Sequence, residues 1–202
     1  MRRIAAVLVV ALFLGVLAYG QALAPADRDR ANKYLETTKQ NILETTKGLS
    51  EAQWNFKPGP NRWSVAEVVE HIAASEDFLF GMIAERVMKA PPRPEGEDVK
   101  AIDEVVLARI PDRSRKAQAP EALRPTNRYG SPETAVTHFV ESRARTVDFL
   151  QKTNDLRAHA IDSAPLGAKL DAFQWVLFIA AHSERHTKQI NEVKADPNFP
   201  KK

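Results

Sequence analysis

His182 and His186 are the pair of residues whose types and spacing most plainly suit chemistry. They lie four apart in a segment that has a helical pattern, so their side chains project about 40° apart around the helix axis, one turn above the other. Trp175 and Ile179 fall on the same side of this helix, so the pair is expected to face the protein interior. Two imidazoles at this spacing can share one metal ion, or they can be hydrogen-bonded core histidines. The pair alone leaves both interpretations open.

His71 is the natural third ligand for such an ion. It flanks the apolar stripe of an earlier helix, and a flank position can face inward because a bundle helix touches two neighbours. His159 lies in a link between helices and is a further candidate, whereas His138 falls opposite the apolar stripe of its helix and is expected to face solvent. A site of three His and no Cys suits Zn, Ni, Fe or Cu, of which we expect Zn or Ni. Three protein ligands leave a position for a bound water, which ionises near about pH 7 and becomes a nucleophile.

Glu76 and Arg143 are charged residues on otherwise apolar helix faces. The simpler interpretation is a buried ion pair, or an Arg143 side chain that extends outward to solvent. The functional alternative makes them the candidate catalytic residues, with Glu76 as a base or a partner of a metal ligand and Arg143 as an anchor for a substrate anion. Glu76 lies about 140° from His71 around the helix, so direct metal binding is not expected of it. Gln189, which follows His182 by one heptad, either supports a metal ligand or hydrogen-bonds across the bundle.

The composition excludes several classes of protein. The chain of 202 residues has no Cys, which excludes disulfides, Cys-based zinc sites and a thiolate nucleophile. With 44% hydrophobic and 27% charged residues, the chain suits one globular domain rather than a disordered one. Charges of both signs are interspersed, and no basic stripe carries aromatic residues, so no nucleic-acid partner is expected. No P-loop, GxGxxG, GxSxG or HExxH motif occurs.

The N-terminus has the pattern of a targeting signal. Arg2 and Arg3 precede an uncharged apolar run of 15 residues, which is short for a membrane span but suits a signal peptide. We therefore expect residues 1–26 to be a signal peptide, residues 27–202 to be the mature domain, and the protein to be exported to the periplasm or secreted. The alternative is an uncleaved N-terminal membrane anchor. No membrane contact beyond this segment is expected.

Four amphipathic helices account for most of the remaining sequence, and no strand pattern longer than a few residues is found. Their expected bounds in chain order are about 27–48, 64–88, 131–153 and 171–195. The second helix begins at a capping box formed by Ser64 and Glu67, and this role also explains Glu67 without a part in the site. The fourth begins at a second capping box, formed by Asp171 and Gln174. The third begins at Ser131, which is followed by a Pro in the first helical position.

The lengths of the links favour one topology. The linker over 50–62 is short, whereas the Pro-rich connection over 90–130 is long and is expected to contain a short helix near 98–108. A connection of that length can return along a helix, so the second and third helices can be parallel neighbours. A simple up-down-up-down bundle would not need it. The sequence therefore predicts an all-α fold, a four-helix bundle with a long crossover.

Two stretches of sequence resemble the DinB/YfiT-like superfamily of damage-inducible and related proteins. The stretch from Trp54 to His71 reads WNFKPGPNRWSVAEVVEH, and the stretch from His182 to Ile190 reads HSERHTKQI. The resemblance extends over about residues 27–200 and implies an up-down-down-up four-helix bundle. It also implies a metal ion held by three His, which correspond to His71, His182 and His186, and a homodimer.

The resemblance implies more than one activity. Members of the superfamily include thiol-dependent S-transferases and isomerases, and proteins regarded as metal-dependent hydrolases. The transferases use low-molecular-weight cytosolic thiols, which an exported protein would meet less often, so hydrolysis or plain binding is favoured. We therefore predict a metal-dependent hydrolase that acts on a small-molecule substrate. The alternatives are a non-catalytic metal-binding or ligand-binding module and a thiol-dependent S-transferase.

Overall fold

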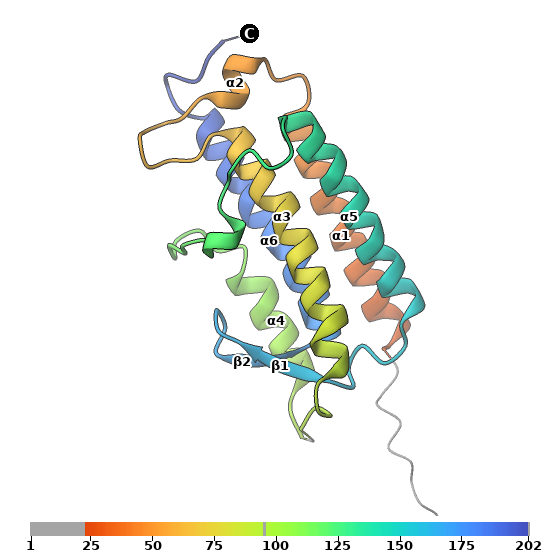
Figure 1. Ribbon diagram of the computed structural model, residues 1–202. Helices are drawn as coiled ribbons and strands as arrows, with labels where there is room; N and C mark the ends of the chain where they lie inside the picture. Colours follow the sequence, from red (N-terminus) through yellow and green to blue (C-terminus); the bar gives the residue numbers. More distant parts are fainter. Residues whose placement is uncertain (1–22, 95, 202) are drawn as a thin grey trace, which may run out of the picture.

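Four long helices form the body of the protein in a computed structural model that describes residues 23–94 and 96–201. They are α1 (Pro25–Thr46), α3 (Val65–Glu85), α5 (Pro132–Lys152) and α6 (Ala172–Lys194). Helices α1 and α3 each pack against both α5 and α6. Figure 1 shows α1 and α6 running one way along the bundle and α3 and α5 running the other way. The predicted all-α bundle with up-down-down-up topology is confirmed.

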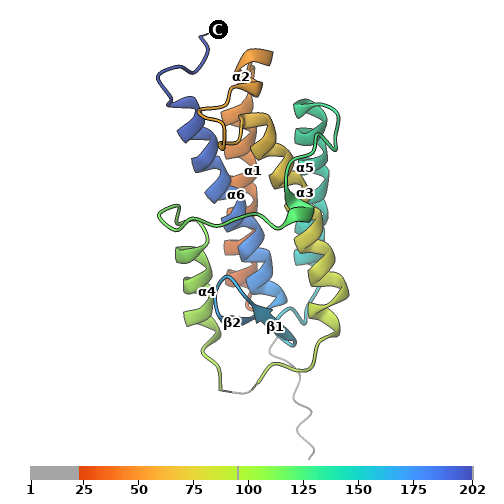
Figure 2. The ribbon, with the colours of Figure 1, turned by 60° about the vertical axis from the view of Figure 1, so that its left-hand side comes forward.

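The long crossover between α3 and α5 returns along the bundle, as its length predicts. It contains η1 (Val87–Lys89), α4 (Val99–Arg109) and η2 (Glu121–Leu123). Helix α4 packs against α6 and is the short helix expected near 98–108. After α4 the chain crosses in front of α6 and reaches η2 beside α3, as Figure 2 shows. The crossover therefore brings irregular backbone to the face where α3 and α6 meet.

The predicted capping residues begin three of the long helices. The Ser64 hydroxyl accepts a hydrogen bond from the Glu67 N–H, and the Glu67 carboxylate accepts one from the Ser64 N–H at 2.8 Å. Asp171 and Gln174 make the same reciprocal pair at the start of α6. Ser131 caps α5. Because a helix start sets the rotation of the following side chains, these caps determine which face each histidine occupies.

A small β-hairpin, which was not among the predicted elements, precedes α6. Strand β1 (Ala160–Ser163) pairs antiparallel with β2 (Ala168–Asp171), and the turn between them places Gly167 at a φ of 64°. Each strand has four residues, which is too few for an alternating pattern to stand out in the sequence. The hairpin leads directly into α6.

Some helix boundaries also differ from those predicted. Helix α3 ends at Glu85, where the chain turns into η1, rather than near residue 88. The linker predicted over 50–62 contains a one-turn helix, α2 (Glu51–Asn55), with its own capping box. Helix α1 begins at Pro25 rather than at 27, and most of the predicted signal peptide lies outside the described residues. Within the described part of the chain, no helix combines the length and the apolar character needed to cross a membrane.

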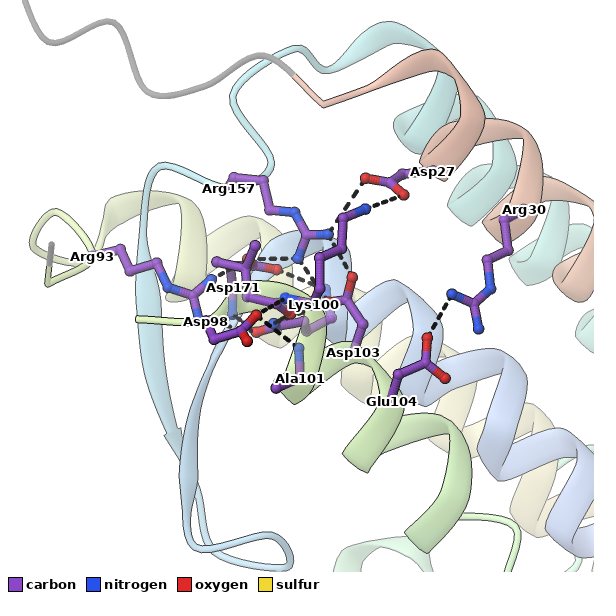
Figure 3. Close-up of polar contacts among 12 residues, drawn as sticks. Asp27, Arg30, Arg93, Asp98, Lys100, Ala101, Asp103, Glu104, Arg157 and Asp171 are labelled. Atoms are coloured by element: carbon purple, nitrogen blue, oxygen red, sulfur yellow. Dashed lines mark hydrogen bonds and ion pairs between the residues drawn. The ribbon is translucent and has the colours of Figure 1, made fainter. Parts of the chain in front are cut away.

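Ion pairs close the end of the bundle where α6 begins (Figure 3). The Arg157 guanidinium donates to both carboxylate oxygens of Asp103 at 2.8 and 2.7 Å and to Asp171 at 3.0 Å. Arg93 of the crossover also pairs with Asp171. Burial raises the pKa of the Asp171 carboxyl, and the charge of Arg157 acts in the opposite direction. The cluster holds α4, the hairpin and the start of α6 together.

Candidate metal centre

His71 on α3 and His182 and His186 on α6 converge at the middle of the bundle. Each offers one ring nitrogen, and these three nitrogens lie within 4.8 Å of one another. Among the described residues, this is the one cluster of three or more potential His, Asp or Glu ligands. The ring centroids are 4.4 to 5.1 Å apart. The structure thus brings together the three histidines that the sequence analysis selected.

Hydrogen bonds on the outer side of two rings orient them. His71 donates from Nδ1 to the carbonyl oxygen of Leu123 at 2.9 Å. His186 donates from Nδ1 to the side-chain oxygen of Gln189 at 2.8 Å. A neutral imidazole that carries its proton on Nδ1 has its lone pair on Nε2. Both rings therefore have the tautomer that suits metal binding through Nε2. The Gln189 oxygen also accepts a hydrogen bond from Arg113 of the crossover at 3.2 Å, so Gln189 contacts both a histidine of the cluster and a neighbouring segment.

The spacing of the nitrogens fits a metal ion. The Nε2 atoms of His182 and His186 lie 3.1 Å apart. In a tetrahedral zinc site with Zn–N bonds of about 2.0–2.1 Å, ligand nitrogens are separated by about 3.3 Å. Because Nε2 of His186 carries no proton, His182 either donates its own proton to that atom or shares a cation with it. The donor set and the spacing therefore suit a divalent transition metal.

Burial keeps all three imidazoles neutral near pH 7. Burial lowers the pKa of His71, although its hydrogen bond to Leu123 opposes this. The pKa values of His182 and His186 lie well below the ordinary value of 6.5, first through burial and then through the neighbouring histidines and cations. Neutral rings are the form that binds metal. His71 and His186 are buried and His182 is half-buried.

Aromatic rings flank the cluster. The ring centroid of Trp63 lies 5.0 Å from that of His71, and Phe178 stacks on His182 at 6.4 Å. Trp175 in turn contacts Phe178 at 5.1 Å. These apolar neighbours lower the local dielectric and strengthen electrostatic interactions within the site.

Glu76 and Arg143 bond to each other in the bundle centre. Arg143 is 0% exposed, which excludes an outward extension to solvent. Its guanidinium makes a two-point contact with the Glu76 carboxylate, including Nε to Oε2 at 3.1 Å. The same guanidinium donates to acceptors on the other two long helices, which are the Leu35 carbonyl, the Thr38 hydroxyl and the Ser183 hydroxyl. The pair connects all four helices, and its predicted catalytic alternative stays a prediction.

The two other histidines lie outside the cluster. His138 meets only part of the expectation that it faces solvent: its side chain is 31% exposed, but its Nε2 contacts Asp77 at 2.5 Å and its ring packs on Tyr129. It lies where α5 packs against α3, and that neighbour could not be assigned from the apolar stripe of α5 alone. His159 pairs with Pro92 beside the hairpin and is not part of the cluster.

Glu70 is a further polar residue beside the cluster, and it was not among the residues predicted from the sequence. This buried carboxylate precedes His71 and accepts hydrogen bonds from the backbone N–H groups of three successive residues, Thr126, Asn127 and Arg128. Burial raises its pKa, but these hydrogen bonds lower it more, so the net pKa is below the ordinary value. No sequence pattern signals this contact, because a single Glu on a helix is usually solvated.

Comparison with known proteins identifies the family. The sequence pattern of the DinB superfamily matches residues 34–190. The chain belongs to the DinB superfamily. This DinB-superfamily chain is similar to the uncharacterized protein YuaE of Bacillus subtilis. The two are 29% identical over 148 residues, which are 73% of this chain and 87% of YuaE.

A solved structure supports the fold of this DinB-superfamily member. YfiT from Bacillus subtilis is similar with a TM-score of 0.55 and 15% sequence identity, over 88% of this chain and 91% of YfiT. YfiT is described as a probable metal-dependent hydrolase with an unusual four-helix bundle topology. The likeness agrees with the topology seen in Figure 1.

Proposed function

We propose that this protein is a metal-dependent hydrolase in which His71, His182 and His186 hold a divalent transition metal ion, Zn or Ni. The observation that carries the proposal is the orientation of the rings. The rings of His71 and His186 donate their Nδ1 protons to oxygen atoms outside the cluster. The Nε2 atoms of the two α6 histidines lie 3.1 Å apart. The description of YfiT as a probable metal-dependent hydrolase supports the proposal.

The residues of the chain prepare the site for this chemistry. A divalent ion held by three His lowers the pKa of a bound water to about 7 and polarises a carbonyl or phosphoryl oxygen. Leu123 and Gln189 keep the Nδ1 protons of His71 and His186 in place, which leaves both Nε2 atoms free.

Turnover by metal-loaded protein tests the proposal. A panel of ester, amide and phosphoester substrates is expected to include one that is hydrolysed, with turnover lost in His186→Ala while the fold survives by circular dichroism. His138→Ala is the matched control, because this histidine lies outside the cluster, and it is expected to keep turnover. Equal turnover by wild type and His186→Ala would contradict the mechanism.

A non-catalytic metal-binding module is the second candidate. The observation that favours it is that, among the described residues, no carboxylate belongs to the three-histidine cluster, and Arg143 binds the Glu76 carboxylate. Stoichiometric metal binding without turnover on the whole panel would support this candidate. A thiol-dependent S-transferase stays a prediction from the family resemblance, and consumption of an electrophile that requires added thiol would test it.

The proposal includes export and a homodimer. Export rests on the basic and apolar pattern of the N-terminal segment, and the dimer rests on the family resemblance. The intact mass of the protein from its native host would identify cleavage, and light scattering would measure the oligomeric state.

A further inference from the structure

We infer that Glu70 is a positioning residue of the metal centre, which orients the His71 ring by anchoring the crossover segment 122–128. The inference rests on the proposed metal site, and it extends that proposal by assigning a function to a residue that is not a ligand. The Glu70 carboxylate hydrogen-bonds the segment 122–128. This segment contains the Leu123 carbonyl, which accepts the Nδ1 proton of His71.

The first connection is a ring of backbone donors around the Glu70 carboxylate. Oε1 accepts from the N–H of Thr126 at 2.7 Å and of Arg128 at 3.1 Å, and Oε2 accepts from the N–H of Asn127 at 2.9 Å. Successive N–H groups point the same way here because Asn127 has a φ of 61°, in the left-handed region. Such backbone concavities bind anions, and here the anion is a side chain of α3.

The second connection runs through the side chain of Arg128. Its Nε donates to Glu70 at 3.2 Å, while its two terminal nitrogens donate to the carbonyls of Ala122 at 3.1 Å and Arg124 at 2.7 Å. These two carbonyls flank Leu123, whose own carbonyl accepts the Nδ1 proton of His71 at 2.9 Å. Glu70 and Arg128 thus hold the backbone on both sides of the acceptor.

These contacts determine which tautomer the His71 ring adopts. While the Leu123 carbonyl stays in place, the proton of His71 is held on Nδ1 and Nε2 keeps its lone pair. If the segment shifts, nothing holds the proton on Nδ1, and the tautomer with the proton on Nε2 cannot bind metal through that atom. Loss of such an orienting contact typically weakens metal binding by 10- to 100-fold, and we expect about 10-fold for Glu70→Gln.

Two substitutions act on this connection from opposite sides. Glu70→Gln keeps the shape of the side chain but replaces one acceptor oxygen with an N–H donor that faces backbone N–H groups. Asn127→Val leaves α3 untouched but disfavours the positive φ that the donor ring needs, whereas Asn127→Gly permits it. Asp77→Asn is the matched control on α3, because the Asp77 carboxylate binds His138, Ser142 and Arg145 of α5 instead of the crossover.

Two measurements on the full-length variants test the inference. The affinity for Zn²⁺ is measured by competition with a chromophoric chelator, and the His71 tautomer is read in metal-free protein from the ¹⁵N chemical shifts of the ring. We expect Glu70→Gln and Asn127→Val to weaken Zn²⁺ binding about 10-fold and to raise the population with the proton on Nε2. Asn127→Gly and Asp77→Asn are expected to match wild type in both measurements.

The outcomes separate this inference from the proposed function. A Glu70→Gln protein that is folded and keeps both the wild-type tautomer and the wild-type affinity would overturn the inference. If wild type itself binds neither Zn²⁺ nor Ni²⁺, the proposed function fails, and the tautomer in metal-free protein still decides whether Glu70 orients His71. If Glu70→Gln does not fold, the Asn127→Val and Asn127→Gly pair gives the decision, and equal tautomer populations in that pair would overturn the inference.

Discussion

Helices α3 and α6 contribute to two polar clusters in the bundle interior, and the two clusters differ in whether the protein completes them. In the ion-pair cluster, the five N–H groups of the Arg143 guanidinium have five acceptors, supplied by Glu76, Leu35, Thr38 and Ser183. In the three-histidine cluster, the outer nitrogens of two rings have protein partners, while the inner nitrogens face one another.

Whether every buried donor and acceptor has a protein partner distinguishes the two clusters. A buried charge whose donors all have protein acceptors is satisfied without a ligand, and in this bundle it connects the four long helices. Lone pairs that converge on one point gain most from a cation between them. His71 and Glu76 are five positions apart on α3, yet only His71 belongs to a cluster whose inner nitrogen atoms can bind a metal ion.

Breaking the ion-pair cluster is expected to have the largest effect on stability. Arg143→Met leaves the Glu76 carboxylate buried without its partner, and such a change costs about 3–5 kcal/mol. Urea unfolding followed by circular dichroism measures the free energy of unfolding. At a temperature low enough for the variant to stay folded, we expect it to bind the same number of Zn²⁺ ions per chain as wild type. Loss of Zn²⁺ binding would show that the histidine cluster depends on the ion pair.

Removing both charges of the ion pair is expected to lower the free energy of unfolding less than removing Arg143 alone. The double variant Arg143→Met/Glu76→Met leaves no unpaired buried charge, so we expect it to be more stable than Arg143→Met alone by about 1 kcal/mol or more. The same urea unfolding experiment measures it. Losses that simply add would show that the two side chains stabilise the bundle independently of each other.

The smallest effect is expected at Asp77, the half-buried neighbour of Glu76. Burial raises the pKa of this carboxyl, but hydrogen bonds from His138 and Ser142 lower it more, so its folded pKa lies below the ordinary value. A lowered folded pKa adds stability above the unfolded pKa of about 3.9, and that stability is lost as the pH falls through the folded pKa.

Asp77→Asn should therefore make the free energy of unfolding less dependent on pH below about pH 4. The effect is expected to stay under about 1 kcal/mol, because the side chain is 37% exposed and solvent screens the contact. Urea unfolding at a series of acidic pH values measures it. An unchanged pH dependence would show that the contacts of the charged Asp77 carboxylate with α5 add nothing to stability.

Local signals in the sequence predicted much of the fold and of the candidate site. The capping boxes at Ser64 and Asp171 placed the starts of α3 and α6 because a cap depends on residues three apart. The spacing of His182 and His186 put both rings on one face for the same reason. The flank position of His71 was sufficient once α3 and α6 proved to be neighbours.

Features that depend on contacts between distant segments could not be predicted. Glu70 acts on residues 126–128, more than fifty positions away, and nothing near it in the sequence marks the partner. The contact between His138 and Asp77 depends on which helix packs beside α5. The hairpin consists of strands too short to show a period.

The metal content of the purified protein shows whether His71, His182 and His186 form a metal centre. Protein purified without a His tag is analysed by inductively coupled plasma mass spectrometry, beside the double variant His182→Ala/His186→Ala. The account predicts about one transition-metal ion per chain in wild type and none in the variant, with both proteins folded. Wild-type protein that holds no metal, even after Zn or Ni is added, would contradict it and would make the three histidines structural.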